Sequence, residues 1–112
     1  MKFYDEKEMG KVREALERTV LRWRGVTTRE MMGCICYFYG SKFFALLITD
    51  AVVITKLPEE GRTRLTQEFG GKPFTMGGKA VKTWVSVPVK RPGDLTAIVP
   101  FVKTSYETAV KA

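Results

Sequence analysis

The segment Lys42–Thr49 constrains the fold most, because it is apolar at both odd and even positions. Successive side chains of a β-strand point to opposite faces of the sheet, so a strand of this kind must be covered on both faces. The stretches 31–39 and 52–57 on either side are rich in sulfur, aromatic and β-branched residues, which are typical of strands. Gly40-Ser41 suits a two-residue hairpin turn, and Asp50-Ala51 suits a second tight turn. The sequence therefore predicts a three-stranded antiparallel meander, and its expected core residues are Phe44, Leu46, Ile48 and Val53.

A helix is predicted before this meander, over residues 5–24. Asp5 and Glu8 have the spacing of a capping box. Apolar residues then recur every three or four positions and form one helical stripe, and these are Met9, Val12, Leu16, Val20 and Trp23. Gly25 suits the end of this helix, which we expect to lie on the sheet with Trp23 largely buried.

The second half of the chain predicts a short helix, at least one strand and a closing helix. Pro58 suits the first turn of the short helix, and Gly70-Gly71 ends it. Val81–Val87 has strand character, with Trp84 on the face opposite to the valines. A closing helix that started at Leu95 would conflict with Pro100, because proline lacks the backbone N–H that a helix interior needs. Either Thr96 caps the helix or a single short turn precedes it.

Residues 70–80 contain two Gly-Gly-Lys triplets, at 70–72 and 77–79, which we expect to frame a loop around Phe74. A Walker phosphate loop is excluded, because Pro73 stands where it needs Gly and Ala80 where it needs Ser or Thr. Two alternatives remain for this segment. One is a looser anion-binding nest, and the other is a flexible turn that Phe74 pins to the core.

Composition limits the classes of protein. The 112 residues, 45% of them hydrophobic, suit one globular domain spanning residues 1–112. The longest apolar run, Phe43–Ile48, is far below the ~20 residues that cross a bilayer. The first residues turn acidic at once and lack a signal core. We therefore expect a cytoplasmic protein without a membrane segment.

Catalytic, cofactor and metal sites are not predicted. The chain has no histidine, which removes the commonest general base and metal ligand. Cys34 and Cys36 lie two apart on a predicted strand, where both point to one face and cannot easily form a disulfide with each other. We expect both to be reduced, buried core thiols.

The formal charge is +7, and much of the imbalance comes from residues 70–93, which carry five basic side chains and no acid. Such a region can attract nucleic acid or another polyanion. The candidate polyanion-binding residues are Lys72, Lys79, Lys82, Lys90 and Arg91.

Several segments, in this order, resemble the TfoX N-terminal domain family. They are 27–33 (Thr-Thr-Arg-Glu-Met-Met-Gly), 39–46 (Tyr-Gly-Ser-Lys-Phe-Phe-Ala-Leu), 56–60 (Lys-Leu-Pro-Glu-Glu), 71–74 (Gly-Lys-Pro-Phe), 84–88 (Trp-Val-Ser-Val-Pro) and the closing helix. The resemblance implies an α+β domain with an antiparallel sheet of about five strands, in the order α-β3-α-β2-α shared with secretion-chaperone-like folds. The family usually has Met-Phe-Gly-Gly where this chain has Met31-Met32-Gly33-Cys34. Its competence regulators carry a second, C-terminal domain, so we expect a single-domain member, for which regulation of natural transformation is not implied.

Three classes of function follow. The first is a non-enzymatic interaction or regulatory module with a protein partner, either as a monomer or as a homo-oligomer such as a dimer. The second is weak, sequence-tolerant nucleic-acid binding through residues 70–93, with Trp84 or tyrosines as stacking platforms. The third, an enzyme, lacks support, because Asp50, Glu59, Glu60 and Asp94 occupy turn and cap positions. The first class is favoured.

Overall fold

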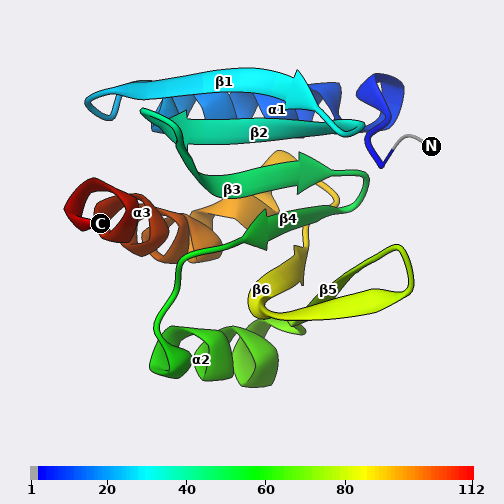
Figure 1. The fold of residues 1–112 in the computed structure, drawn as a ribbon. Helices are drawn as coiled ribbons and strands as arrows, with labels where there is room; N and C mark the ends of the chain where they lie inside the picture. Colours follow the sequence, from blue (N-terminus) through cyan, green and yellow to red (C-terminus); the bar gives the residue numbers. More distant parts are fainter. Residues whose placement is uncertain (1–2) are drawn as a thin grey trace.

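A computed structural model describes residues 3–112, and it confirms the α+β class: three helices and one antiparallel sheet (Figure 1). The sheet has six strands, not about five, in the spatial order β1-β2-β3-β4-β6-β5. In chain order the elements are α1 (Glu6–Val20), β1 (Val26–Met31), β2 (Cys34–Tyr39), β3 (Lys42–Ile48), β4 (Ala51–Ile54), α2 (Glu59–Phe69), β5 (Lys72–Met76), β6 (Lys79–Pro88), the 3₁₀ turn η1 (Pro92–Asp94) and α3 (Leu95–Lys111).

The additional strand is β1, which sequence analysis did not predict. Its register with β2 runs from Val26 opposite Tyr39 to Met31 opposite Cys34. The predicted first strand, 31–39, is instead interrupted by a turn at Met32-Gly33, where both residues have positive φ, +54° and +76°. A methionine in the left-handed region is unusual, so the tight hairpin holds it there.

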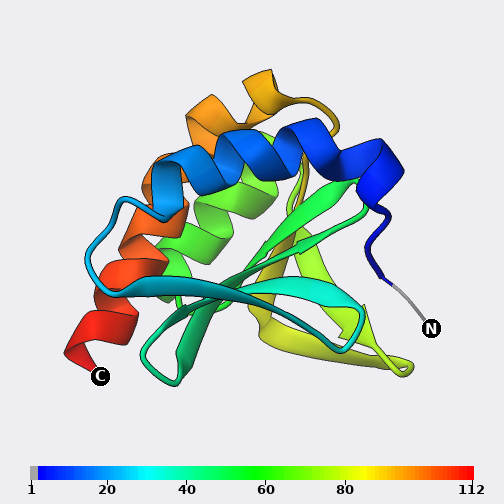
Figure 2. The ribbon, with the colours of Figure 1, turned by 90° about the horizontal axis from the view of Figure 1, so that it is seen from above.

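All three helices lie on one side of the sheet (Figure 2). The large hydrophobic core fills the space between them and the strands, and α1 contributes the predicted stripe of Met9, Val12, Leu16 and Val20, all fully buried. Trp23 packs against this core only half-buried, because α1 ends at Val20 and not at residue 24.

The central strand β3 is covered on both faces, as its composition predicts. Phe44 and Leu47 belong to the core on the helix side, whereas Leu46 belongs to a second, smaller cluster on the other side. Val53 of β4 also lies in the second cluster and is fully buried, while Ile48 is half-buried. The β4 strand begins at Ala51, one residue earlier than predicted, because Asp50 takes the left-handed turn position at φ +64°, and it ends at Ile54 instead of Leu57.

The ends of α1 differ in detail from the prediction. The Asp5 carboxylate caps the helix by accepting from the Lys7 backbone N–H at 2.9 Å. The Asp5 N–H donates to Thr49 Oγ1 and not to Glu8, so the cap also fixes α1 to the β3–β4 turn. Gly25 has φ +77°, but it follows the helix by several residues and is pressed against the Tyr39 ring.

The segment predicted as a loop around Phe74 is strand β5, which forms a hairpin with β6 through Gly77-Gly78. Phe74 is buried, as expected. Pro73 is tolerated because β5 is an edge strand, and the pairing shifts register between Pro73 and Phe74. Two glycines in a hairpin turn, with no helix after them, do not form the phosphate-binding arrangement of strand, loop and helix.

The closing helix resolves the two alternatives for Pro100. A single 3₁₀ turn, η1, does precede α3, but α3 starts at Leu95, so the alternative with Thr96 as N-cap is wrong. Pro100 therefore lies inside the helix. Pro100 itself is exposed, and the other side of α3 packs on the sheet through the buried residues Ile98, Phe101 and Val102.

Candidate interaction surface

Within residues 3–112 no helix covers the face of the sheet turned away from α1, α2 and α3, and we call it the helix-free face. Its buried cluster contains strand residues alone: Cys34, Cys36, Phe38, Leu46, Val53 and Phe74. Phe3, Met31, Phe43, Ile48 and Trp84 pack around them and remain partly exposed. This face therefore presents partly exposed aromatic rings above a thin apolar layer.

One line of paired residues crosses all six strands on this face. In register from β1 to β5 its members are Arg29, Cys36, Leu46, Val53, Ser86 and Lys72. Directly paired residues point to the same face, and neighbouring strands are ~4.8 Å apart, so this cross-sheet row is about 24 Å long measured along the sheet. A cation stands at each edge, and no acid lies between the two.

Five aromatic side chains form a continuous chain over the same face. The ring centroids of Phe38 and Phe43 are 6.1 Å apart, and those of Phe43 and Trp84 are 5.2 Å apart in an edge-to-face arrangement. Trp84 then stacks on Phe74 at 6.1 Å, and Phe74 meets Phe3 at 6.1 Å. We call these five residues the aromatic row. The predicted position of Trp84, opposite to the β6 valines, is confirmed.

Two cations lie over rings of the aromatic row. The Arg29 guanidinium is 4.9 Å from the Phe38 centroid, and the Lys56 ammonium is 5.8 Å from that of Phe43. Both distances are within the range of an attractive cation–π contact. Each contact holds a positive charge beside an aromatic ring.

A shallow hollow of about 530 Å³ adjoins the other end of the aromatic row. Phe3 and Phe74 form part of its apolar wall, and Lys72 and Lys90 lie at its rim together with Asp50. The backbone of Phe3 closes one side, because its N–H donates to the Gly33 carbonyl and its carbonyl accepts from the Thr49 N–H. Among the described residues that line this hollow, two are basic and one is acidic.

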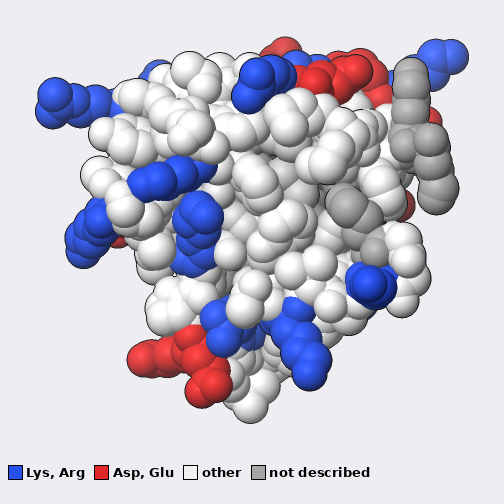
Figure 3. Space-filling view, viewed as in Figure 1, with Lys and Arg blue, Asp and Glu red and all other residues white. Residues whose placement is uncertain are grey.

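Figure 3 shows the charge distribution on the helix-free side of the molecule. Uncharged surface occupies the centre, and basic side chains are distributed around and across it. Acidic side chains gather at the upper margin and at one lower corner. This side is therefore largely uncharged at its centre, with basic side chains both at the margin and across it.

The five candidate polyanion-binding residues are all exposed, but they do not form one cluster. Lys72 and Lys90 share the hollow described above. Lys82 lines a separate hollow of about 320 Å³ beside Glu59 and Arg62 of α2, and Lys79 follows the β5–β6 turn. The backbone N–H of Arg91 donates to the Asp94 carboxylate.

Sequence analysis missed Arg29 and Lys56 as members of a basic surface. They lie 27 positions apart in the chain and outside the basic segment 70–93. Strand alternation together with the β1–β2 register could have placed Arg29 beside Cys36. That required the strand 26–31, which sequence analysis did not predict.

The two cysteines lie in the layer beneath the aromatic row and are free and buried. Burial raises the pKa of the Cys34 thiol to about 11 and also raises the pKa of Cys36. A thiolate is the reactive form, so both groups are poor nucleophiles near neutral pH. The prediction that both are buried core residues is confirmed.

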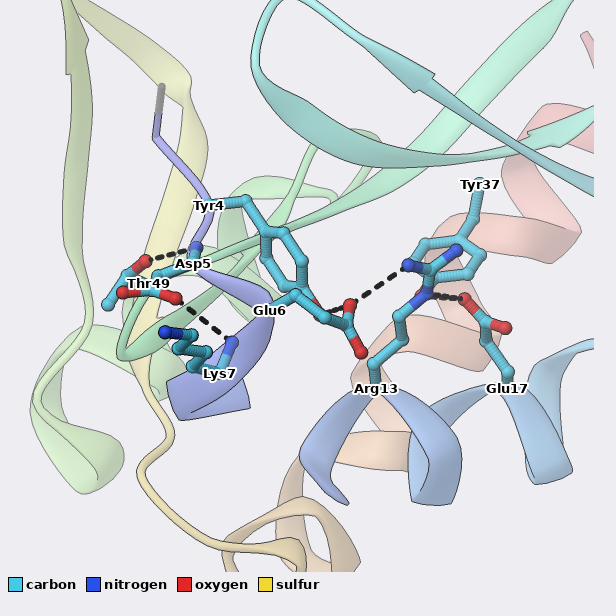
Figure 4. A network of polar contacts seen from close by, with 8 residues as sticks. All are labelled: Tyr4, Asp5, Glu6, Lys7, Arg13, Glu17, Tyr37 and Thr49. Atoms are coloured by element: carbon cyan, nitrogen blue, oxygen red, sulfur yellow. Dashed lines mark hydrogen bonds and ion pairs between the residues drawn. The ribbon is translucent and has the colours of Figure 1, made fainter. Parts of the chain in front are cut away.

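A polar network on the α1 side joins the helix to the sheet (Figure 4). Arg13 pairs with Glu17 at 2.8 Å and with Glu6 at 3.1 Å, and the buried Tyr37 hydroxyl donates to Glu17 at 2.9 Å. Tyr4 donates to Glu6, and burial together with this carboxylate raises the pKa of Tyr4 to about 12. Burial beside Glu17 likewise raises the pKa of Tyr37. Phenols with raised pKa values are poor general bases, so this network is structural.

A second aromatic cluster lies on the helix side, where Trp23 and Tyr106 meet at 5.2 Å with Lys103 above Trp23. The Tyr106 hydroxyl donates to the Arg24 carbonyl at 2.6 Å. This contact fixes α3 to the segment that follows α1. The cluster therefore joins α3 to the segment between α1 and β1.

Among residues 3–112 there is no cluster of three or more metal-ligating carboxylates and thiols. No helix in this range is long and apolar enough to cross a membrane.

A comparison with family models matches residues 19–109 to the model described as the TfoX N-terminal domain. Searches of curated proteins and of solved structures gave no match. The family match covers all six strands, α2 and nearly all of α3, and it leaves out most of α1 and Phe3. The chain belongs to the TfoX N-terminal domain family.

Proposed function

We propose that this chain is a non-enzymatic interaction or regulatory module whose recognition surface is the helix-free face. The observation that carries the proposal is the aromatic row. Phe3, Phe43 and Trp84 stay partly exposed on a face that no helix covers. Aromatic residues left at the surface in this way are typical of binding sites.

The state of the reactive groups supports a binding role over catalysis. The raised pKa values of Cys34, Tyr4 and Tyr37 hold these groups in their protonated forms near neutral pH. A thiol or phenol that acts as a nucleophile or general base requires a lowered pKa. Membership of the TfoX N-terminal domain family, which is not known as an enzyme family, agrees with this proposal.

Site-specific photo-crosslinking in cells that express the chain tests the proposal. A photoreactive amino acid at Thr27, which pairs with Phe38 on the helix-free face, should give adducts with a binding partner. The matched position is Lys11, which is equally exposed on α1. Adducts of equal yield at both positions, or only at Lys11, would contradict the proposal.

A further inference from the structure

Strand alternation separates opposite charges at the outer edge of the sheet. Arg29 and Glu30 are neighbours in β1, so their side chains point to opposite faces. Arg29 lies over Phe38 on the helix-free face, whereas Glu30 lines a hollow with Glu6 and Arg13 beside α1. The edge strand therefore adds its cation to the helix-free face and keeps its acid away from it.

Cations also accompany the rings across the rest of this face. Lys56 stands over Phe43 near the middle of the aromatic row, and Lys72 and Lys90 stand at the hollow beside Phe74. Asp50 is the one acid that lines this hollow. Positive charges thus lie over and beside the rings along the face, and the whole chain carries a net charge of +7.

This arrangement of rings and cations fits a nucleic-acid partner better than a protein partner. A protein interface of ordinary size buries roughly 800 Å² per partner around a continuous apolar centre from which charges are depleted. Here Phe38 and Phe74 are only 5% and 4% exposed, and cations stand among the rings that are accessible. A polymer in which flat apolar rings alternate with negative charges matches both features.

We propose that the helix-free face binds single-stranded nucleic acid, with unpaired bases against Phe43 and Trp84 and phosphates near Arg29, Lys56, Lys72 and Lys90. The inference rests on the proposed function and names the partner of the same surface. A single strand is favoured over a duplex because a duplex stacks its bases on each other and hides their flat faces from side chains. Recognition is sequence-tolerant, since every base has a face that can stack.

Fluorescence anisotropy with a labelled oligothymidylate of about 15 nucleotides tests the inference. Two to four phosphate contacts, at a log–log salt slope of about −0.7 per contact, should weaken binding roughly 7- to 50-fold between about 50 and 200 mM salt. Duplex DNA of the same length should bind more weakly at equal salt. Tighter binding of the duplex, or no binding of the oligothymidylate at about 50 mM salt, would overturn the inference.

Paired charge variants locate the binding. Arg29→Gln with Lys56→Gln should lower the affinity by about tenfold or more at ~50 mM salt and reduce the slope by about 1.4. Lys7→Gln with Lys11→Gln removes the same charge from exposed positions on α1, and it should leave the slope unchanged and alter the affinity by less than a factor of about two. Equal losses in both double variants would show a general charge effect and contradict the assignment to this face.

A ring variant tests the stacking. Trp84→Leu should weaken binding by about 5- to 150-fold, the range for loss of one stacked base. Because Trp84 packs on Phe43 and Phe74, the folding of the Trp84→Leu variant is checked by circular dichroism. If this variant does not fold, the paired charge variants test the inference instead. If the oligothymidylate fails to bind while crosslinks still concentrate at Thr27, the partner is a protein and the proposed function stands. If crosslinks avoid Thr27, the proposed function fails as well.

Discussion

Replacing Leu46 with Ala tests whether the layer beneath the aromatic row is a true core. Leu46 is fully buried between Cys36 and Val53 in the cross-sheet row. The substitution removes three carbon atoms, and at about 0.8 kcal/mol per buried methylene the transfer term alone is ~2.4 kcal/mol. The cavity adds to this, so we expect a loss of about 2–4 kcal/mol in the free energy of unfolding.

The matched control is Leu47→Ala, the next residue of β3, which is equally buried but points to the helix side. The large core there is enclosed by α1 and α3, whereas the half-buried Phe43 and Ile48 can move into a cavity left by Leu46. We therefore expect Leu47→Ala to cost more, about 3–5 kcal/mol.

Urea denaturation with an unchanged m-value measures both losses. A loss below about 1 kcal/mol for Leu46→Ala would refute the reasoning, since no well-packed core Leu is lost so cheaply. The helix-free face would then be a loosely covered surface, and the rigid placement of its rings would not hold.

Three further predictions concern single groups. Tyr37→Phe should cost about 0.5–1.5 kcal/mol in urea denaturation, because the hydrogen bond to Glu17 is lost. Since the folded pKa of Tyr37 is raised, its contribution is present below about pH 10 and is lost as pH rises further, so the wild type should lose stability more steeply than the variant in alkali; parallel alkaline curves would contradict this. Native Cys34 should react with a thiol reagent far more slowly than the urea-unfolded chain does, and equal rates in a spectrophotometric assay would show that it is accessible. Gly25→Ala should destabilise by about 1–3 kcal/mol more than Gly77→Ala, because both have positive φ but only at Gly25 would the new Cβ meet a ring, at 2.7 Å; equal melting temperatures for the two variants would argue against that close contact.

The elements with strong periodic patterns could be predicted from the sequence. The apolar stripe of α1 and the apolar residues on both faces of β3 are visible in the sequence, because the burial of each element leaves its own periodic pattern. β1 was not predicted, because this edge strand buries little. Thr27, Arg29 and Glu30 are exposed, and Val26, Thr28 and Met31 are only half-buried. β5 was not predicted because Pro73 argues against a strand, although an edge strand tolerates proline.

The candidate surface was less accessible to prediction than the fold. The basic segment 70–93 is visible because its charges are neighbours in sequence, but the structure places only Lys72 and Lys90 at one hollow. Arg29 reaches the same face through five strand pairings, and each pairing depends on register. Register is set by turns such as Met32-Gly33 and by bulges, which weak local signals specify poorly.

The two tryptophans provide the most direct test that the helix-free face is the recognition surface. Trp84 lies in the aromatic row, and Trp23 lies on the helix side beside Tyr106, so each reports on one face. The indole N–H resonances of the protein labelled with ¹⁵N in tryptophan can be followed by NMR during titration with oligothymidylate at ~50 mM salt. We expect the Trp84 resonance to shift or broaden while that of Trp23 stays unchanged. A shift of Trp23 with Trp84 unaffected would contradict it.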